Sequence, residues 1–129
     1  MSSAPSERQS GDLKMSAALV FAGGAVGSVL RFGISEATPN TFLSLAVVNL
    51  LGSLVLGVVN SHSWFKPQSR QLIWGAGFSG GFTTMSGLSL LGLEQFGVNN
   101  IWSGFIGLSV LGGALFYWLG KFIGQRLSR

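Results

Sequence analysis

A few polar side chains inside long uncharged runs are the residues of this chain that could do chemistry. Asn49 lies in the run FLSLAVVNLLGSLVLG, where nearly all of its neighbours are apolar. A side-chain amide in such surroundings commonly makes a hydrogen bond to another helix. Its N–H groups could equally donate to an anion that passes through a pore. The sequence leaves both interpretations of Asn49 open.

The stretch GFSGGFTTMSGL, residues 77–88, places four glycines and four hydroxyl side chains in the middle of another uncharged run. Glycine is a poor helix former, and Ser and Thr compete for backbone hydrogen bonds. We interpret the stretch as a broken helix, which is tolerated at membrane depth only where the backbone is buried in protein or lines a cavity. Carbonyl groups freed at a break can bind a cation, and a helix N-terminus can face an anion. A simple packing kink is the alternative interpretation.

Charged groups give fewer candidates. Arg31 lies near the end of its apolar run, where it is either an interfacial anchor or part of a positively charged vestibule that attracts anions. The uncharged runs hold no Asp or Glu, which argues against a proton-coupled exporter of cationic drugs. No Ser/His/Asp set, metal-ligand cluster or phosphate-binding loop is visible in the sequence, so an enzyme is not expected.

The composition indicates which kind of element positions these groups. Only 9% of the 129 residues are charged and 47% are hydrophobic, whereas an ordinary soluble domain has roughly 25% charged residues. There are no cysteines, which excludes disulfides and thiolate metal sites. The net charge of +4 does not indicate nucleic-acid binding, because the basic residues flank apolar runs instead of gathering on one face.

Four uncharged runs predict four transmembrane helices, since a span needs about 20 mostly apolar residues. The expected spans are 14–34, 41–62, 71–96 and 100–124. A soluble bundle would need a polar face on each helix, and a transmembrane barrel would need alternating strands. We therefore predict an all-α membrane protein whose third helix is broken at mid-membrane. Its transmembrane domain covers 14–129 and follows a polar tail over 1–13, which we expect to be disordered and not a signal peptide.

Small residues recur at a spacing that lets membrane helices approach one another closely. Glycines lie four residues apart in three of the expected spans, at Gly23 and Gly27, Gly77 and Gly81, and Gly120 and Gly124. Such pairs are a packing signal common in membrane proteins. They predict a tight assembly of helices and say little about function.

The distribution of Lys and Arg predicts an orientation. With four spans, the N-terminal tail, the middle loop and the C-terminus share one side of the membrane. That side carries Arg8, Lys14, Lys66, Arg70, Lys121, Arg126 and Arg129. Arg31 is on the opposite side. Because Lys/Arg bias sets topology, we expect a multi-pass protein of the cell inner (plasma) membrane, with both termini in the cytoplasm and one fixed orientation.

Three motifs, taken together and in this order, resemble the Fluc (CrcB) family of fluoride channels. GGAVGSVLRF is similar to the first-helix signature of that family, VVNLLGSLVLG to the second, and GFSGGFTTMSG to the central motif. The resemblance covers about residues 17–124. It implies a four-helix subunit that assembles as an antiparallel dimer with two pores. It also implies passive export of fluoride from the cytoplasm, which limits fluoride toxicity.

The resemblance assigns roles to individual residues. It implies a structural sodium ion at the dimer centre, held by backbone carbonyls of Gly80 and Thr83. Asn49 matches the pore amide that meets fluoride, and Ser86 and Ser109 match hydroxyls of the polar track. Amide and hydroxyl donors are what a selective pore needs to replace the water around a small, strongly hydrated anion.

The sequence departs from the family pattern at several positions of the anion path. The two pore phenylalanines fall on Met85 and Leu88, and neither side chain offers an anion the partly positive edge of a ring. The usual tyrosine falls on Phe105, and a later hydroxyl position falls on Gly113. The glutamate that usually follows the motif falls on Leu91.

These departures and the charge bias lead to a hypothesis about the partner. A subunit that pairs with its own inverted copy must insert both ways, which requires a weak Lys/Arg bias. We therefore infer a subunit of fixed orientation that pairs with an oppositely inserted relative, which supplies the missing aromatic residues. A homodimer stays open, as do a membrane packing subunit without transport of its own and a channel of altered selectivity for another small anion.

Overall fold

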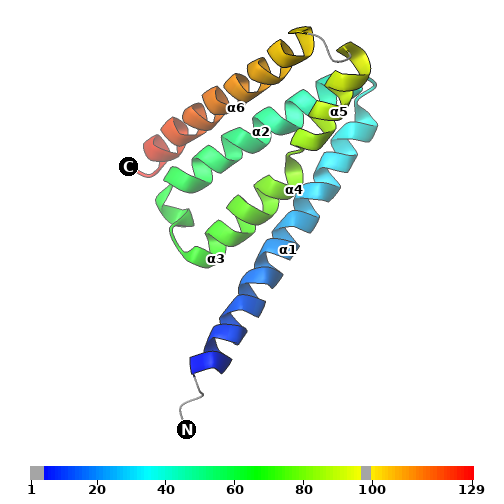
Figure 1. Cartoon of the computed structure of the whole chain (residues 1–129). Coiled ribbons are helices and arrows are strands. Elements are labelled where there is room, and N and C mark those ends of the chain that lie inside the picture. Colours follow the sequence, from blue (N-terminus) through cyan, green and yellow to red (C-terminus); the bar gives the residue numbers. More distant parts are fainter. Residues whose placement is uncertain (1–4, 97–99) are drawn as a thin grey trace.

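The computed structural model describes the backbone of residues 5–96 and 100–129, and within these ranges it is helical apart from short turns. The elements are α1 (Pro5–Ala37), α2 (Thr41–Ser61), η1 (Ser63–Phe65), α3 (Gln68–Arg70), η2 (Gln71–Ser79), α4 (Gly80–Phe82), α5 (Met85–Phe96) and α6 (Asn100–Leu127). We call α3, η2, α4 and α5 together the third segment. Figure 1 shows α1, α2, the third segment and α6 running alternately in opposite directions.

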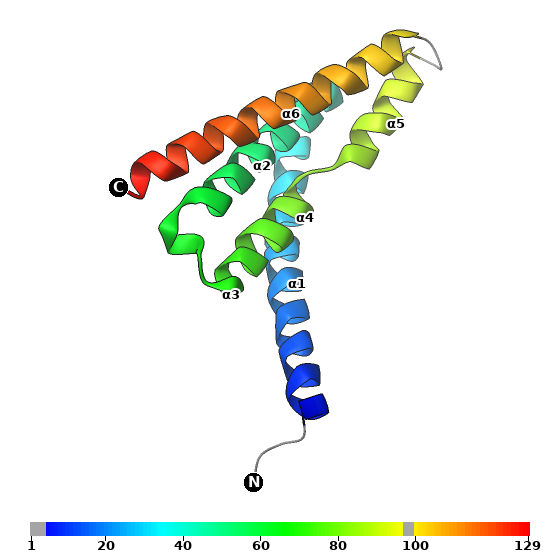
Figure 2. The same ribbon diagram turned by 60° about the vertical axis from the view of Figure 1, so that its left-hand side comes forward.

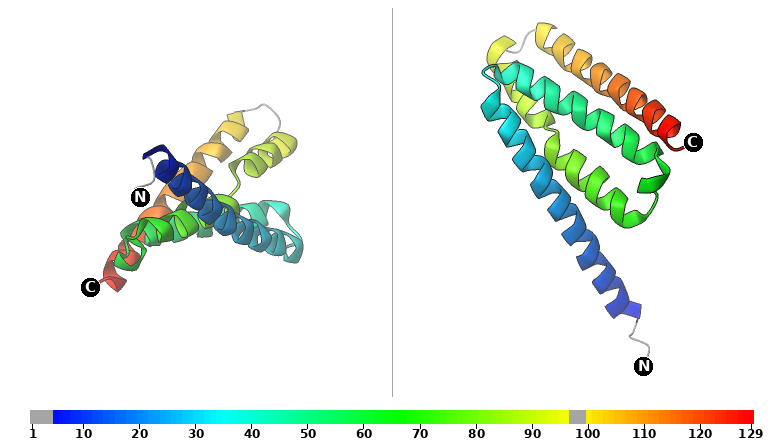
Figure 3. Two further views of the ribbon diagram at one scale, coloured as in Figure 1. Left: turned by 90° about the horizontal axis from the view of Figure 1, so that it is seen from below. Right: turned by 180° about the vertical axis from the view of Figure 1, so that it is seen from behind.

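The helices lie side by side in an order that differs from their order in the chain. Helix α2 packs against α6 on one side and against η2 on the other, and α1 packs against η2 and α4. The rear view in Figure 3 shows α2 between α6 and the third segment. Both ends of the described chain and the η1–α3 connection lie toward one end of the molecule, and the α1–α2 turn lies at the other (Figure 1).

Three helices of the described chain are long and apolar enough to cross a membrane, over Gln9–Ala37, Thr41–Ser61 and Ile106–Leu127. The expected span over 71–96 does not form one continuous helix, because it is divided between η2, α4 and α5. Large apolar side chains face outward on the spanning helices, with Phe21 79% and Trp118 70% exposed. Such a surface suits contact with lipid and not with water.

The N-terminal segment differs from its expectation. Residues 5–13, expected to be disordered, form the first turns of α1. A helix is costly to nucleate and cheap to extend, so a long apolar helix can propagate into a neighbouring segment that contains good helix formers such as Glu7 and Gln9. Proline is also tolerated in a first turn, where Pro5 lies. Figures 1 and 2 show this end of α1 projecting beyond the other helices.

Glycines bring α1 into backbone contact with the first half of the third segment. A Cβ atom at Gly23 or Gly27 would collide with backbone atoms of Phe78, and one at Gly77 or Gly81 would collide with the backbone of α1. The close approach predicted from the pairs spaced four apart is therefore present within one chain. No side chain larger than hydrogen fits at these positions unless the helices move apart.

A second close contact joins α2 and α6. A Cβ atom at Gly57 would meet the carbonyl oxygen of Tyr117, and one at Gly120 would meet that of Leu54. Gly124 continues the contact next to the backbone of Val58. These two glycine-lined contacts hold α1 and α6 on opposite sides of a centre formed by α2 and the third segment.

Candidate functional site

The predicted break in the third helix lies at Thr83 and Thr84, between α4 and α5. Thr83 leaves the helical conformation with φ −86° and ψ 154°. Its N–H and its hydroxyl both donate to the carbonyl oxygen of Ser79, at 3.0 and 2.8 Å, which closes the preceding turn. Figure 2 shows α5 leaving the line of η2 and α4 after this point. The glycines of the motif, Gly80 and Gly81, are still helical, and the break follows them.

Asn49 of α2 holds the break from the side. Its Nδ2 donates to the carbonyl oxygen of Thr84 at 3.0 Å, and the N–H of Thr84 donates to its Oδ1 at 2.7 Å. Both backbone groups of Thr84 thus have a partner in the side chain of Asn49. The interhelical hydrogen bond, one of the two interpretations of Asn49, is therefore made. An amide nitrogen carries two N–H groups, so Asn49 retains a second donor.

The hydroxyl groups after the break cap α5. The Oγ1 of Thr84 accepts from the N–H of Gly87 at 3.1 Å, as an N-cap residue does. The hydroxyl of Ser86 lies 3.3 Å from the same Oγ1. Ser86, which the family resemblance places on the polar track, therefore contacts the cap of α5 and is not part of the cavity wall described next.

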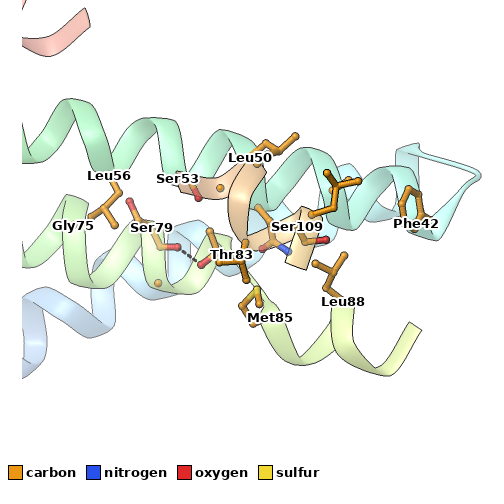
Figure 4. A pocket seen from close by; sticks show the side chains of 18 of the residues that line it. Phe42, Leu50, Ser53, Leu56, Gly75, Ser79, Thr83, Met85, Leu88 and Ser109 are labelled. Carbon is orange, nitrogen blue, oxygen red and sulfur yellow. Dashed lines mark hydrogen bonds between the residues drawn. The ribbon is translucent and has the colours of Figure 1, made fainter. Parts of the chain in front are cut away.

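A cavity of about 770 Å³ opens between α2, the third segment and α6. Of the residues predicted for the site, the cavity wall contains Asn49, Gly80, Thr83, Met85, Leu88 and Ser109. Figure 4 shows Thr83, Met85, Leu88 and Ser109 around the same space, although they come from different elements. The structure thus gathers most of the predicted site from three separate parts of the sequence. The side chain of Phe105 lies outside what the structure describes.

Met85 and Leu88, which the resemblance matches to the two pore phenylalanines, differ from each other. Met85 is 50% exposed and lies on the open side of the cavity wall, whereas Leu88 is only 3% exposed. Leu88 therefore serves mainly to pack α5 against its neighbours, and Met85 presents a flexible, polarisable thioether to the cavity. Neither side chain supplies a ring edge.

Arg31 contacts the break from α1. Its Nη1 lies 3.4 Å from the carbonyl oxygen of Thr83, and the side chain is half-buried. Next to it, the hydroxyl of Ser28 donates to the carbonyl oxygen of Gly81 at 3.3 Å. Arg31 thus brings a positive charge to the break itself and is not solely an anchor at the membrane surface.

The carbonyl groups of Gly80 and Thr83, which the resemblance implies in sodium binding, both lie at the break. The Gly80 carbonyl loses its helical i+4 partner, because the N–H of Thr84 donates to Asn49 instead. Gly80 is exposed, and no atom lies within 4 Å of a Cβ built on it. The Thr83 carbonyl is turned out of the helix, and among the described residues its contact is the long one from Arg31. Two backbone oxygens of this kind fit a hard cation such as sodium.

Side-chain ligands do not offer an alternative metal site in the part of the chain that the structure describes. No group of three or more His, Cys, Asp or Glu residues gathers there. A cation at the break would therefore depend on backbone oxygens. One chain supplies two of them, Gly80 and Thr83, so a complete shell would need oxygens from a second chain or from water.

Sequence reasoning missed two hydroxyl residues of the cavity wall, Ser53 and Ser79. Ser79 is buried and donates to the carbonyl oxygen of Trp74 at 2.9 Å, five residues earlier, in the wide turn of the π-helix. Ser53 lies four residues after Asn49 and so on the same face of α2. That spacing was the available signal for Ser53; the wide turn that positions Ser79 has no clear signal in the sequence.

Comparison with known proteins places the chain in a family. Residues 18–121 match the family described as "CrcB-like protein, Camphor Resistance (CrcB)". No solved structure matches the chain. Curated relatives named "Fluoride-specific ion channel FluC" include one from Pseudomonas fluorescens, 37% identical over 78% of this chain and 90% of the relative. Another, from Gloeobacter violaceus, is 37% identical over 84% and 95%.

A third relative of the same name, from Dehalococcoides mccartyi, is 31% identical over 86% of this chain and 93% of its own length. The family match covers all of the elements that line the cavity, from α2 to α6. The chain is a membrane protein, with three helices able to span a bilayer and ion channels as its relatives. The chain belongs to the CrcB family, which is a family of ion channels and not of enzymes.

Proposed function

We propose that this chain is a subunit of a fluoride-selective channel that lets fluoride leave the cytoplasm passively and so limits its toxicity. The observation that carries the proposal is the cavity beside the helix break, which collects the Asn49 amide and the Ser109 hydroxyl within an otherwise apolar protein. Polar groups held inside a membrane domain are costly and mark the paths of ions. The name of the curated relatives supports fluoride as the ion.

The chemistry of the cavity suits a small anion. Fluoride binds water strongly, so a pore that selects it must replace water with hydrogen-bond donors. The second N–H of Asn49 is such a donor, and its position is fixed because the rest of the amide is hydrogen-bonded to Thr84. Export needs no energy source, because fluoride enters cells as the neutral acid, ionises in the more alkaline cytoplasm, and leaves down its gradient.

The proposal includes a structural, non-transported sodium ion. The carbonyl oxygens of Gly80 and Thr83 would hold it, and when bound it would place a positive charge beside the anion path. In an antiparallel dimer the same two carbonyls of the other subunit would complete the shell. Asn49 has the task of keeping the break open in this arrangement, since its hydrogen bond withholds the Thr84 N–H from Gly80.

The second subunit of the proposed dimer has two possible identities. In one form the channel is an antiparallel homodimer. One subunit then has both termini in the cytoplasm, and the other has both termini outside. The other form is a heterodimer with an oppositely oriented paralogue in the inner membrane. The exposed Met85 in place of a phenylalanine favours the heterodimer, because a partner could supply the missing rings. A channel with altered selectivity for another small anion is a second candidate function, favoured by the same residue.

The experiment that tests the proposal measures fluoride efflux from liposomes that contain this chain. We expect fluoride efflux that is fast relative to chloride and that falls sharply in Asn49→Leu, which removes the donor and the contact with Thr84. Asn60→Leu is the matched control, since Asn60 lies on the same helix but outside the cavity, where its Nδ2 contacts the Tyr117 hydroxyl at 3.3 Å.

Each outcome points to one form of the channel. Selective efflux from this chain alone would support a homodimer and would contradict the need for a partner with aromatic residues. Absence of efflux from correctly inserted protein, followed by efflux after co-reconstitution with an inverted relative, would support the heterodimer. Equal efflux of fluoride and chloride would contradict fluoride selectivity and favour the channel of altered selectivity.

A further inference from the structure

The hydroxyl group of Ser53 occupies a place in the cavity wall that neither the motifs nor the comparisons assign. A Cβ atom built on Gly113 of α6 would lie 3.4 Å from the Oγ of Ser53, which is ordinary van der Waals contact. The Ser53 hydroxyl therefore lies where a side chain of residue 113 would project from the opposite helix.

Ser53 and Gly113 belong to two matching pairs of positions. Asn49 and Ser53 are four residues apart on α2, and Ser109 and Gly113 are four residues apart on α6. Residues at this spacing share a helix face, and all four residues line the one cavity. Figure 4 shows Ser53 and Ser109 bordering the same space from α2 and α6. The cavity therefore has a second polar level, one helical turn from Asn49.

The Ser53 hydroxyl is available to a ligand. Hydroxyls on helices often donate to a carbonyl three or four residues earlier, as Ser61 does to Gly57 at 2.8 Å. Ser53 makes no such bond, nor any other to the described residues. No buried side-chain oxygen or nitrogen of the described chain lacks a hydrogen-bond partner. The Ser53 oxygen is therefore accessible from the cavity.

We infer that Ser53 is an anion-binding residue of the channel, which donates a hydrogen bond to the ion one helical turn from the Asn49 amide. This inference rests on the proposed function and extends it. An ion that leaves the Asn49 amide would meet the next donor about one helical turn away, roughly 5–6 Å between Cβ atoms. Several weak sites in sequence let an ion both enter and leave a pore.

The test moves the hydroxyl from one helix to the other. Ser53→Ala is expected to slow fluoride efflux from liposomes roughly 10- to 100-fold, which is the loss expected when one hydrogen bond to an ion is removed. The double variant Ser53→Ala/Gly113→Ser should recover most of the lost efflux. Ser53→Ala/Gly113→Ala is the matched control, because it fills the same space without a hydroxyl, and it should stay slow.

A second readout does not depend on conduction. An anion that binds the folded protein raises its unfolding temperature, by an amount that grows with the ratio of the anion concentration to the dissociation constant. The midpoint of thermal unfolding is measured in potassium fluoride and in potassium chloride at equal concentration. We expect a fluoride-specific increase for the unmodified chain and for Ser53→Ala/Gly113→Ser, and a smaller increase for Ser53→Ala and the alanine control.

The outcomes separate the inference from the proposed function. If the unmodified chain neither conducts fluoride nor is stabilised by it, both alone and after co-reconstitution with an inverted relative, the proposed function fails, and the inference fails with it. If the unmodified chain responds in either assay and Ser53→Ala responds equally, the inference alone is overturned. Equal recovery by Gly113→Ser and Gly113→Ala in the Ser53→Ala background would also overturn it, since volume and not the hydroxyl would then be the cause.

Discussion

The two halves of the third segment are held in place by different means. The half before the break, η2 and α4, lies against α1 with backbone touching backbone through Gly77 and Gly81. The half after the break, α5, is held at its first residues by the hydrogen bonds of Asn49 to Thr84 and by the buried Leu88. Close backbone packing against α1 therefore holds the first half in place. The hydrogen bonds of Asn49 and the buried side chain of Leu88 hold the second half.

The difference explains where the cavity lies. The first half presents one face to α1 so closely that no space remains there, and its other face borders α2 and the cavity. The second half leaves the line of the first (Figure 2), and its residues Met85 and Leu88 line the cavity. This arrangement suits a channel, because the half before the break is held rigidly against α1 and the half after it diverges beside the cavity. Four substitutions test the comparison.

The largest effect is expected from Gly27→Ala in α1. The added Cβ would meet backbone atoms of Phe78, Gly81 and Phe82, which cannot move aside as a flexible side chain could. We expect a loss of more than about 3 kcal/mol in the free energy of unfolding, measured by denaturation in detergent micelles. Gly33→Ala in the same helix is the control, since no atom lies within 4 Å of a Cβ there. Similar stability of both variants would contradict the view that close packing against α1 holds the first half.

Leu88→Ala tests the anchor of the second half. Leu88 is 3% exposed, and truncation would leave a cavity in the packing of α5. We expect a loss of about 2 kcal/mol in the same denaturation experiment, at the lower end of the range for buried leucines. Met85→Ala, three residues earlier on the same helix, changes a half-exposed side chain and should cost less. If the two variants are equally stable, Leu88 is not the anchor of α5.

Asn49→Leu tests the hydrogen bonds at the break. Interhelical hydrogen bonds in membrane proteins contribute roughly 1 kcal/mol, so the expected loss of stability is modest. The sharper measurement is hydrogen exchange at individual amides. The N–H of Thr84 loses its partner and should exchange faster, whereas the N–H of Thr83 keeps the Ser79 carbonyl and should not change. Unchanged exchange at Thr84 would show that Asn49 does not hold the break.

The smallest effect is expected from Arg31→Gln. The contact of Arg31 with the Thr83 carbonyl is long, at 3.4 Å, and its loss should change the free energy of unfolding by less than about 1 kcal/mol. The same denaturation experiment, with Lys66→Gln at the other end of the molecule as the control, measures this change. A large loss of stability in Arg31→Gln would mean that the first half of the segment also depends on hydrogen bonding. It would contradict the view that close packing against α1 is sufficient to hold that half.

The sequence was sufficient to predict an all-helical chain with a break in its third segment, because uncharged length and clustered Gly, Ser and Thr act locally. Of the four expected spans, three correspond to continuous helices long and apolar enough to cross a membrane. The sequence did not locate the break at Thr83 and Thr84, since this depends on Asn49, 35 residues away, accepting a backbone hydrogen bond. The π-helical course of η2 and the helical start of α1 at Pro5 were likewise not predicted. Each depends on packing or helix propagation that no local pattern records.

In the candidate site too, residues in recognisable local patterns were predicted, and a residue whose role depends on a distant helix was not. The family resemblance led to Asn49, Gly80, Thr83 and Ser109, and the structure brings these residues to one cavity. It did not lead to Ser53, because a single serine among apolar residues is common in a membrane helix. Its place on the cavity wall, opposite Gly113 of α6, is visible only when the two helices are placed side by side.

The hydrogen bond between Asn49 and Thr84 also bears on how the protein is made. A broken helix has backbone groups without partners, and hydrocarbon offers them none, so the third segment is a poor candidate for entering the bilayer alone. Synthesis proceeds from the N-terminus, and α2 therefore leaves the ribosome before the residues of the break. The side chain of Asn49 is therefore synthesised before the backbone of Thr84, with which it forms hydrogen bonds. The order of translation thus provides a partner for the N–H and carbonyl groups of Thr84 before these groups need one.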